Sequence, residues 1–150
     1  WAATAQRVDR AGADRLSATD VRTLCLLDAY GALIANTDRH HGNISLLLHN
    51  DQWQLAPAYD MLPMLYAPVA GELVPRDFAA NPPRPSVHTL AVWPRARELA
   101  TRFWQTAEAA FSTSLPLSVP NGARSISAGR SMKGLLPPAP TLPPRSTGRT

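Results

Sequence analysis

The last forty residues limit what this 150-residue chain can fold into. Residues 111–150 contain seven of the fifteen prolines, many Ser and Thr residues, and no acidic side chain. Five basic side chains give them a net charge of +5, whereas ten Arg and eleven Asp and Glu leave residues 1–110 at −1. This composition has too little apolar surface to offset the entropy lost on folding. We therefore expect a folded domain over residues 1–111 and a disordered Pro/Ser/Arg-rich tail over residues 112–150.

The basic tail leaves three interpretations open. A solvated tail is the one that its composition favours. Weak, non-specific contact with DNA through counterion release is the second. A frameshifted or otherwise non-native end, with Pro, Ser and Arg in no periodic order, is the third.

The remaining composition fits one soluble globular domain. Hydrophobic residues make up 45% of the chain, which is ordinary for a folded protein. The single Cys25 excludes an internal disulfide and is consistent with a reducing, cytoplasmic location. The longest apolar stretch, residues 21–35, is interrupted by Arg22 and Asp28, so we expect no membrane segment. The first residue is Trp1, which suggests a trimmed start or the downstream piece of a longer protein.

Two segments have helical periodicity. Ser17 stands three residues before Asp20, a variant of the capping box that begins a helix. The apolar residues that follow recur at helical spacing: Val21, Leu24, Leu27, Tyr30, Leu33 and Ile34. A second helix is predicted over residues 94–110, with Pro94 at its first position. Its expected buried face contains Leu99, Phe103, Trp104 and Ala107.

Between these helices the sequence predicts a polar loop, a β-hairpin and a long loop. Residues 36–43, Asn-Thr-Asp-Arg-His-His-Gly-Asn, form a polar loop. Residues 44–49 and 52–57 then predict two short strands around an Asn-Asp turn, a β-hairpin that Pro57 ends. Residues 67–93 contain five prolines and predict a long loop, which either gates an acceptor or is a surface excursion.

The spacing of three polar residues around the hairpin fits phosphoryl transfer. This chemistry needs a carboxylate at the acceptor hydroxyl and oxygen ligands that hold Mg²⁺ on the phosphates. Asp38 precedes Asn43 by five residues, as in the kinase catalytic loop, and Asp60 follows the hairpin. Because a hairpin returns the chain to its starting point, Asp60 is expected beside Asn43.

These motifs resemble a known family. Residues 36–47 and residues 55–63, Leu-Ala-Pro-Ala-Tyr-Asp-Met-Leu-Pro, are similar to the C-terminal lobe of HipA-like serine/threonine kinases, the toxins of bacterial toxin–antitoxin modules. The sequence around Asp60 resembles the YjjJ-like branch of that family. The resemblance, over roughly residues 1–110, implies an α+β, mainly α fold: a protein-kinase-like C-terminal lobe with one short hairpin.

The resemblance also implies roles for individual residues. Asp38 would be the catalytic base, while Asn43 and Asp60 would be the Mg²⁺ ligands. His40 and Tyr59 would line the ATP site. The implied activity is transfer of the ATP γ-phosphate to a Ser or Thr hydroxyl of a protein substrate, with an antitoxin as a further partner.

The chain departs from the family pattern in three places. Gly42 stands where many members have Lys before the metal-binding Asn. No Gly-rich phosphate loop is present, and the only lysine is Lys133. We therefore expect a truncated C-terminal lobe that is inactive alone, because half of the ATP site is missing. The alternative is a non-catalytic remnant or binding module, which contacts an antitoxin or touches DNA through the tail.

A metal hydrolase or nuclease is another interpretation of the same loop. His40 and His41 lie close to Asp38, but adjacent histidines point in different directions and rarely bind one ion. No H-x3-H or H-E-x-x-H pattern is present. The spacing therefore favours the kinase-like interpretation over a zinc site.

Overall fold

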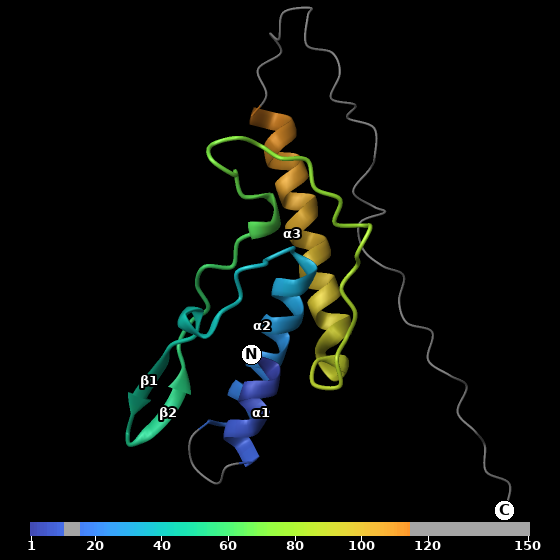
Figure 1. Cartoon of the computed structure of the whole chain (residues 1–150). Coiled ribbons are helices and arrows are strands. Elements are labelled where there is room, and N and C mark those ends of the chain that lie inside the picture. The colour runs from blue at the N-terminus through green and yellow to red at the C-terminus, as the bar shows by residue number, and fades with distance from the viewer. Residues whose placement is uncertain (11–15, 115–150) are drawn as a thin grey trace, which may run out of the picture.

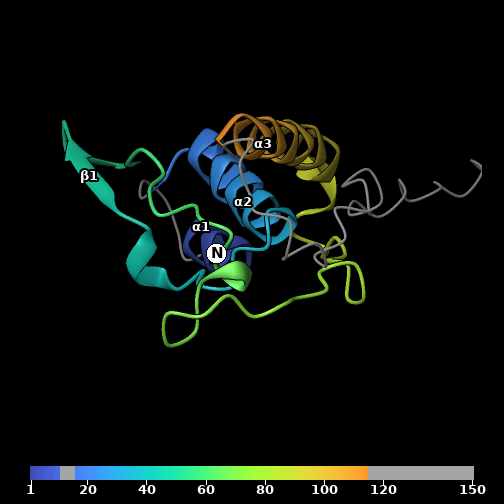
Figure 2. The same cartoon turned by 90° about the horizontal axis from the view of Figure 1, so that it is seen from above.

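The structure, a computed structural model, describes residues 1–10 and 16–114. Its helices are α1 (Ala2–Arg10), α2 (Ala18–Leu33) and α3 (Trp93–Ser114), and its two strands are β1 (Leu46–His49) and β2 (Gln52–Leu55). In both views α3 lies alongside α2, while the hairpin projects away from the helices (Figures 1 and 2). The predicted α+β, mainly α fold is confirmed. The predicted disordered tail lies outside the described residues, apart from the last turn of α3, and stays a prediction.

Helix α2 begins where the capping pattern predicts. Ser17 is its N-cap, and the Ser17 hydroxyl oxygen accepts a hydrogen bond from the backbone N–H of Asp20 at 3.0 Å. The same hydroxyl donates to the Asp20 carboxylate at 2.9 Å. The first of these bonds satisfies a backbone donor that the first turn of a helix leaves without an intrahelical partner, and the second holds the Ser17 hydroxyl in place.

The C-terminal end of α2 turns the chain sharply into the polar loop. Ala35 adopts the left-handed conformation, with φ of 62°. The N–H of Asn36 donates to the Gly31 carbonyl at 2.9 Å, and the N–H of Ala35 donates to the Ala32 carbonyl at 3.2 Å. This pair of bonds is the Schellman motif. It places Asn36 directly at the end of a buried helix, which fixes where the polar loop starts.

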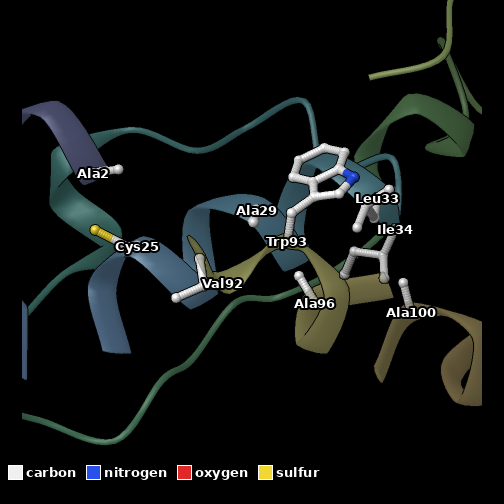
Figure 3. Packing of buried hydrophobic residues seen from close by; sticks show 9 residues of the cluster. All are labelled: Ala2, Cys25, Ala29, Leu33, Ile34, Val92, Trp93, Ala96 and Ala100. Atoms are coloured by element: carbon white, nitrogen blue, oxygen red, sulfur yellow. The ribbon is translucent and has the colours of Figure 1, made fainter. Parts of the chain in front are cut away.

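The main core lies between α2 and α3. Ala96 and Ala100 are completely buried on the side of α3 that faces Ile34 (Figure 3). Such small side chains let the two helices approach closely, and Trp93 fills the space at the start of α3. Helix α3 therefore has a buried face that agrees only partly with the predicted one. Trp104 is buried as predicted, but the other three predicted residues are only half-buried: Leu99, Phe103 and Ala107. The centre of the face is formed by the two alanines with Trp93.

The hairpin has the predicted strands and turn. Its register pairs Leu46 with Leu55 and His49 with Gln52. Asn50 and Asp51 both have positive φ, 48° and 61°, as a two-residue type I′ turn requires. The strand side chains are mostly exposed on both faces, including four large apolar ones: Leu46, Leu47, Leu48 and Trp53.

Residues 67–89 form the predicted long loop, which runs back along α3 (Figure 1). Phe78 anchors this loop because its buried side chain joins Ala35 and Trp104 in a second core cluster. Within the described residues, no helix has the length and apolar character needed to cross a membrane.

Candidate functional site

Asn36 joins the two predicted motifs from inside the fold. Its side chain is fully buried, with 0% of its surface exposed. The amide oxygen accepts a hydrogen bond from the backbone N–H of Asp38 at 2.9 Å, and the amide nitrogen donates to the backbone carbonyl of Asp60 at 3.3 Å. Because buried polar groups are costly unless they are paired, this arrangement ties the Asp38 loop and the Asp60 segment together.

Arg39 fixes the same loop to α2. Its Nε donates to the Asp28 carboxylate at 3.3 Å, and its guanidinium also donates to the carbonyl of Asn36. The arginine stem lies directly against Gly31, where a Cβ would come within 2.6 Å of the Arg39 Cδ. The backbone on the C-terminal side of Asp38 is therefore fixed to α2 by an ion pair and by close packing.

The structure brings Asn43 and Asp60 into direct contact. The amide nitrogen of Asn43 donates to the Asp60 carboxylate at 3.1 Å and to the backbone carbonyl of Asp38 at 3.0 Å. Asp60 has a left-handed φ of 54°, a conformation that non-glycine residues seldom adopt. This contact confirms the expectation that the hairpin returns Asp60 to the end of the polar loop.

Asp38 lies beside this pair with an accessible carboxylate. The Asp38 side chain is half exposed, and its Oδ1 is 3.8 Å from Nε2 of His40. The backbone carbonyl of His40 accepts a hydrogen bond from the indole N–H of Trp1 at 2.9 Å. The carboxylate can therefore be reached by a hydroxyl group from solvent, while the backbone around it is held in place.

Tyr59 and Gly42 hold the hairpin against the loop. The Tyr59 hydroxyl donates to the Gly42 carbonyl at 2.7 Å and lies 3.0 Å from the Ser45 hydroxyl. A Cβ on Gly42 would come within 2.9 Å of the His40 ring, so a larger residue there requires the ring to move. Tyr59, predicted to line a nucleotide site, is thereby bonded to the residue that precedes Asn43, and His40, the other residue of that prediction, lies beside Asp38.

The donor set at Asn43 and Asp60 fits a hard divalent cation. One carboxylate and one amide supply oxygen ligands, and Mg²⁺ is usually bound by one or two carboxylates together with substrate phosphates. In the described part of the chain, neither Oδ1 of Asn43 nor Oδ1 of Asp60 has a hydrogen-bond partner. Both oxygens are therefore available to a metal ion, with the Asn43 amide reoriented away from its present contact with Asp60.

The zinc alternative lacks a suitable cluster. Across residues 1–10 and 16–114, no three His, Cys, Asp or Glu side chains are grouped so that they could hold a metal ion. The His41 ring lies 2.9 Å from the Thr4 hydroxyl and does not join His40. The adjacent histidines thus point to different partners, as their spacing indicates.

Three residues of the site were not identified from the sequence. They are Asn36, Arg39 and Asp28, none of which was assigned a role. The available signals were a polar residue shortly after a helix, and an acid within an apolar stretch of the helix, eleven residues before an arginine. Neither signal names a partner, so the network became visible only in three dimensions.

Comparison with known proteins identifies the class. A family model described as the HipA-like C-terminal domain matches residues 2–127, so the chain belongs to this family. The predicted family is thereby confirmed.

A particular relative supports the predicted branch. The chain is 44% identical over 78 residues to Toxin YjjJ of Escherichia coli (strain K12). This alignment includes 52% of the chain and 17% of the toxin, so the chain spans less than a fifth of its relative's length. No solved structure matches the chain.

Proposed function

We propose that the chain is the C-terminal catalytic-lobe portion of a HipA-like toxin kinase. The whole enzyme would transfer the γ-phosphate of ATP to a Ser or Thr hydroxyl of a protein, with Mg²⁺. The observation that carries this proposal is the 3.1 Å contact between Asn43 and Asp60, made by an amide that also bonds the backbone of Asp38. Three groups that phosphoryl transfer requires are thus held together in a family known to contain toxins.

The residues divide the chemistry between them. Asn43 and Asp60 would hold Mg²⁺ through their oxygen atoms, and the ion would supply positive charge that offsets the negative charge of the phosphates. Asp38 accepts or orients the proton of the acceptor hydroxyl, for which its half-exposed carboxylate is suitably placed. Asn36 and Arg39 keep these groups in register, because positioning supplies much of the rate in phosphoryl transfer.

The ATP site needs groups that this chain does not supply. It has no Gly-rich loop, and Lys133 is its only lysine. The hairpin exposes Leu47, Leu48 and Trp53, an apolar surface that suits contact with a nucleotide-binding lobe. We therefore expect the isolated chain to lack kinase activity, because several groups must act together to stabilise the transferred phosphoryl group.

A chimera tests the proposal. This chain would replace the matching segment of Toxin YjjJ, and incorporation of label from γ-labelled ATP into protein would be measured with Mg²⁺. We expect incorporation by the chimera, none by the isolated chain, and none above a heat-killed control for the chimera with Asp38→Asn. A chimera without activity, beside an active parent toxin, would favour the alternative of a non-catalytic remnant or an antitoxin-binding module. An inactive parent would contradict the kinase mechanism itself.

A further inference from the structure

A cleft of about 440 Å³ opens beside the polar loop. One wall is formed by the end of α2 and by Thr37 and Arg39, the two neighbours of Asp38. The rest of the lining comes from Leu65 and from four residues of the long loop: Asp77, Phe78, Asn81 and Pro83. Asp38 does not line the cleft although both of its neighbours do. The cleft therefore suits a side chain that flanks the acceptor residue and not the acceptor residue itself.

The cleft is lined by apolar side chains together with a carboxylate. Half of the lining residues are apolar: Ala32, Ala35, Leu65, Phe78 and Pro83. Asp77 lies at this apolar surface, and its Oδ1 accepts a hydrogen bond from the N–H of Ala80 at 3.1 Å. Within the described residues, no cation forms an ion pair with Asp77. Asp77 is exposed, and the cleft that it lines is partly apolar. A partly apolar cleft with a carboxylate that has no cation partner suits an aliphatic stem that ends in a positive charge.

The other charged residue of the cleft does not cancel this preference. Arg39 forms an ion pair with Asp28 and donates to the carbonyl of Asn36, so its guanidinium is engaged on the α2 side. Asp28 also pairs with the terminal amine of Trp1 at 3.6 Å. Asp77 is therefore the charge that an incoming side chain meets.

We propose that this cleft binds an Arg or Lys side chain of the acceptor protein, close in sequence to the Ser or Thr that Asp38 serves, and that Asp77 determines this specificity. This proposal rests on the proposed function, because it assumes a protein acceptor. Binding of the acceptor side chain can nevertheless be measured without kinase activity. An extended peptide advances about 3.3–3.6 Å per residue, so a side chain a few positions from the hydroxyl reaches a cleft that begins one residue from Asp38.

Peptide binding to the 150-residue chain tests the proposal. Fluorescein-labelled peptides with one Ser would carry a single Arg at successive positions on either side of it, and matched peptides would carry citrulline, which has the same shape without the charge. Polarisation should show one Arg position that binds about threefold to tenfold more tightly than its citrulline partner, as expected for a partly screened ion pair. This preference should decrease as salt increases.

Three variants separate Asp77 from general effects. Asp77→Asn should remove the preference for Arg while keeping an oxygen that accepts from Ala80. Asp77→Glu should keep the preference. Glu72→Gln is the matched control, because Glu72 is an exposed acid of the same loop outside the cleft, and it should behave as wild type.

Two results would overturn the inference: no preference for Arg in the wild type, or a preference that survives in Asp77→Asn. Failure of the proposed function is a separate outcome. An active chimera whose chain binds both peptides equally refutes only the role of the cleft. Selective binding of Arg peptides by a chain whose chimera and parent are inactive refutes only the kinase mechanism.

Discussion

Replacement of Asn36 by alanine is the most informative single perturbation of the site. The wild-type side chain is fully buried and joins the Asp38 backbone at 2.9 Å to the Asp60 backbone at 3.3 Å. Asn36→Ala removes both bonds and leaves an N–H and a carbonyl without these partners. A typical hydrogen bond contributes about 0.5–1.5 kcal/mol, and an unsatisfied buried partner costs about 1–3 kcal/mol. Because Asp38 and Asp60 are exposed enough for water to replace part of the loss, we expect the free energy of unfolding to fall by about 2 kcal/mol.

Urea unfolding of the 150-residue chain measures this loss. Trp93 and Trp104 are buried in the two core clusters, so tryptophan fluorescence reports the transition. A loss of 2 kcal/mol should lower the urea midpoint by roughly 1–2 M for a domain of this size. Asn81→Ala is the matched control, since Asn81 is exposed and should change stability by less than about 0.5 kcal/mol. If Asn36→Ala also loses less than this with an unchanged slope, Asn36 does not join the two motifs in solution.

Two further predictions concern the contact between α2 and the loop, and a third concerns the buried Cys25. Asp28→Ala should lower the free energy of unfolding by about 1–2 kcal/mol. Arg39→Ala should cost less in the Asp28→Ala background than in the wild type, because the ion pair is already lost there and only the bond to the Asn36 carbonyl remains to be removed. A double-mutant cycle measures this coupling, and strict additivity would contradict it. Gly31→Ala usually stabilises an open helix position by about 1 kcal/mol. Here it should destabilise the chain, because the new Cβ would lie 2.6 Å from the Arg39 Cδ. In an Arg39→Ala background the same change should stabilise the chain, and urea unfolding measures both effects. Cys25 should react slowly with a thiol reagent at mildly alkaline pH, because burial, and secondarily Asp28, raise the pKa of its thiol and so reduce the fraction of thiolate. It should react rapidly in concentrated denaturant, and a fast reaction of the folded chain would contradict the structure.

Local patterns were sufficient to predict much of this fold. Ser17 and Asp20 mark the start of α2 because capping depends on residues three apart. The Asn50–Asp51 turn predicts the hairpin because these residue types tolerate positive φ. The same hairpin brings Asp60 beside Asn43, so one long-range contact of the site could be inferred from local structure.

Other parts of the fold depend on partners that spacing does not reveal. The buried face of α3 is centred on Ala96 and Ala100, whereas hydrophobic spacing favours larger neighbours such as Leu99. Small residues become the centre only when another helix approaches closely, which is a tertiary property. The partners of Asn36 and the pairing of Asp28 with Arg39 likewise follow from how separate segments meet.

The central claim is that Asp60 binds metal while Asp38 handles the acceptor proton. Calorimetry of Mg·ATP binding, run beside the kinase assay on the chimera with Toxin YjjJ, tests this claim most directly. Asp60→Asn should weaken Mg²⁺-dependent nucleotide binding as well as turnover, because a carboxylate–metal contact is lost in the bound ground state. Asp38→Asn should leave nucleotide binding nearly unchanged and lower turnover by about 10²–10⁴-fold, as is typical of general base catalysis. Loss of nucleotide binding in Asp38→Asn with normal binding in Asp60→Asn would mean that the two roles are reversed, and unchanged turnover in both variants would contradict phosphoryl transfer at this site.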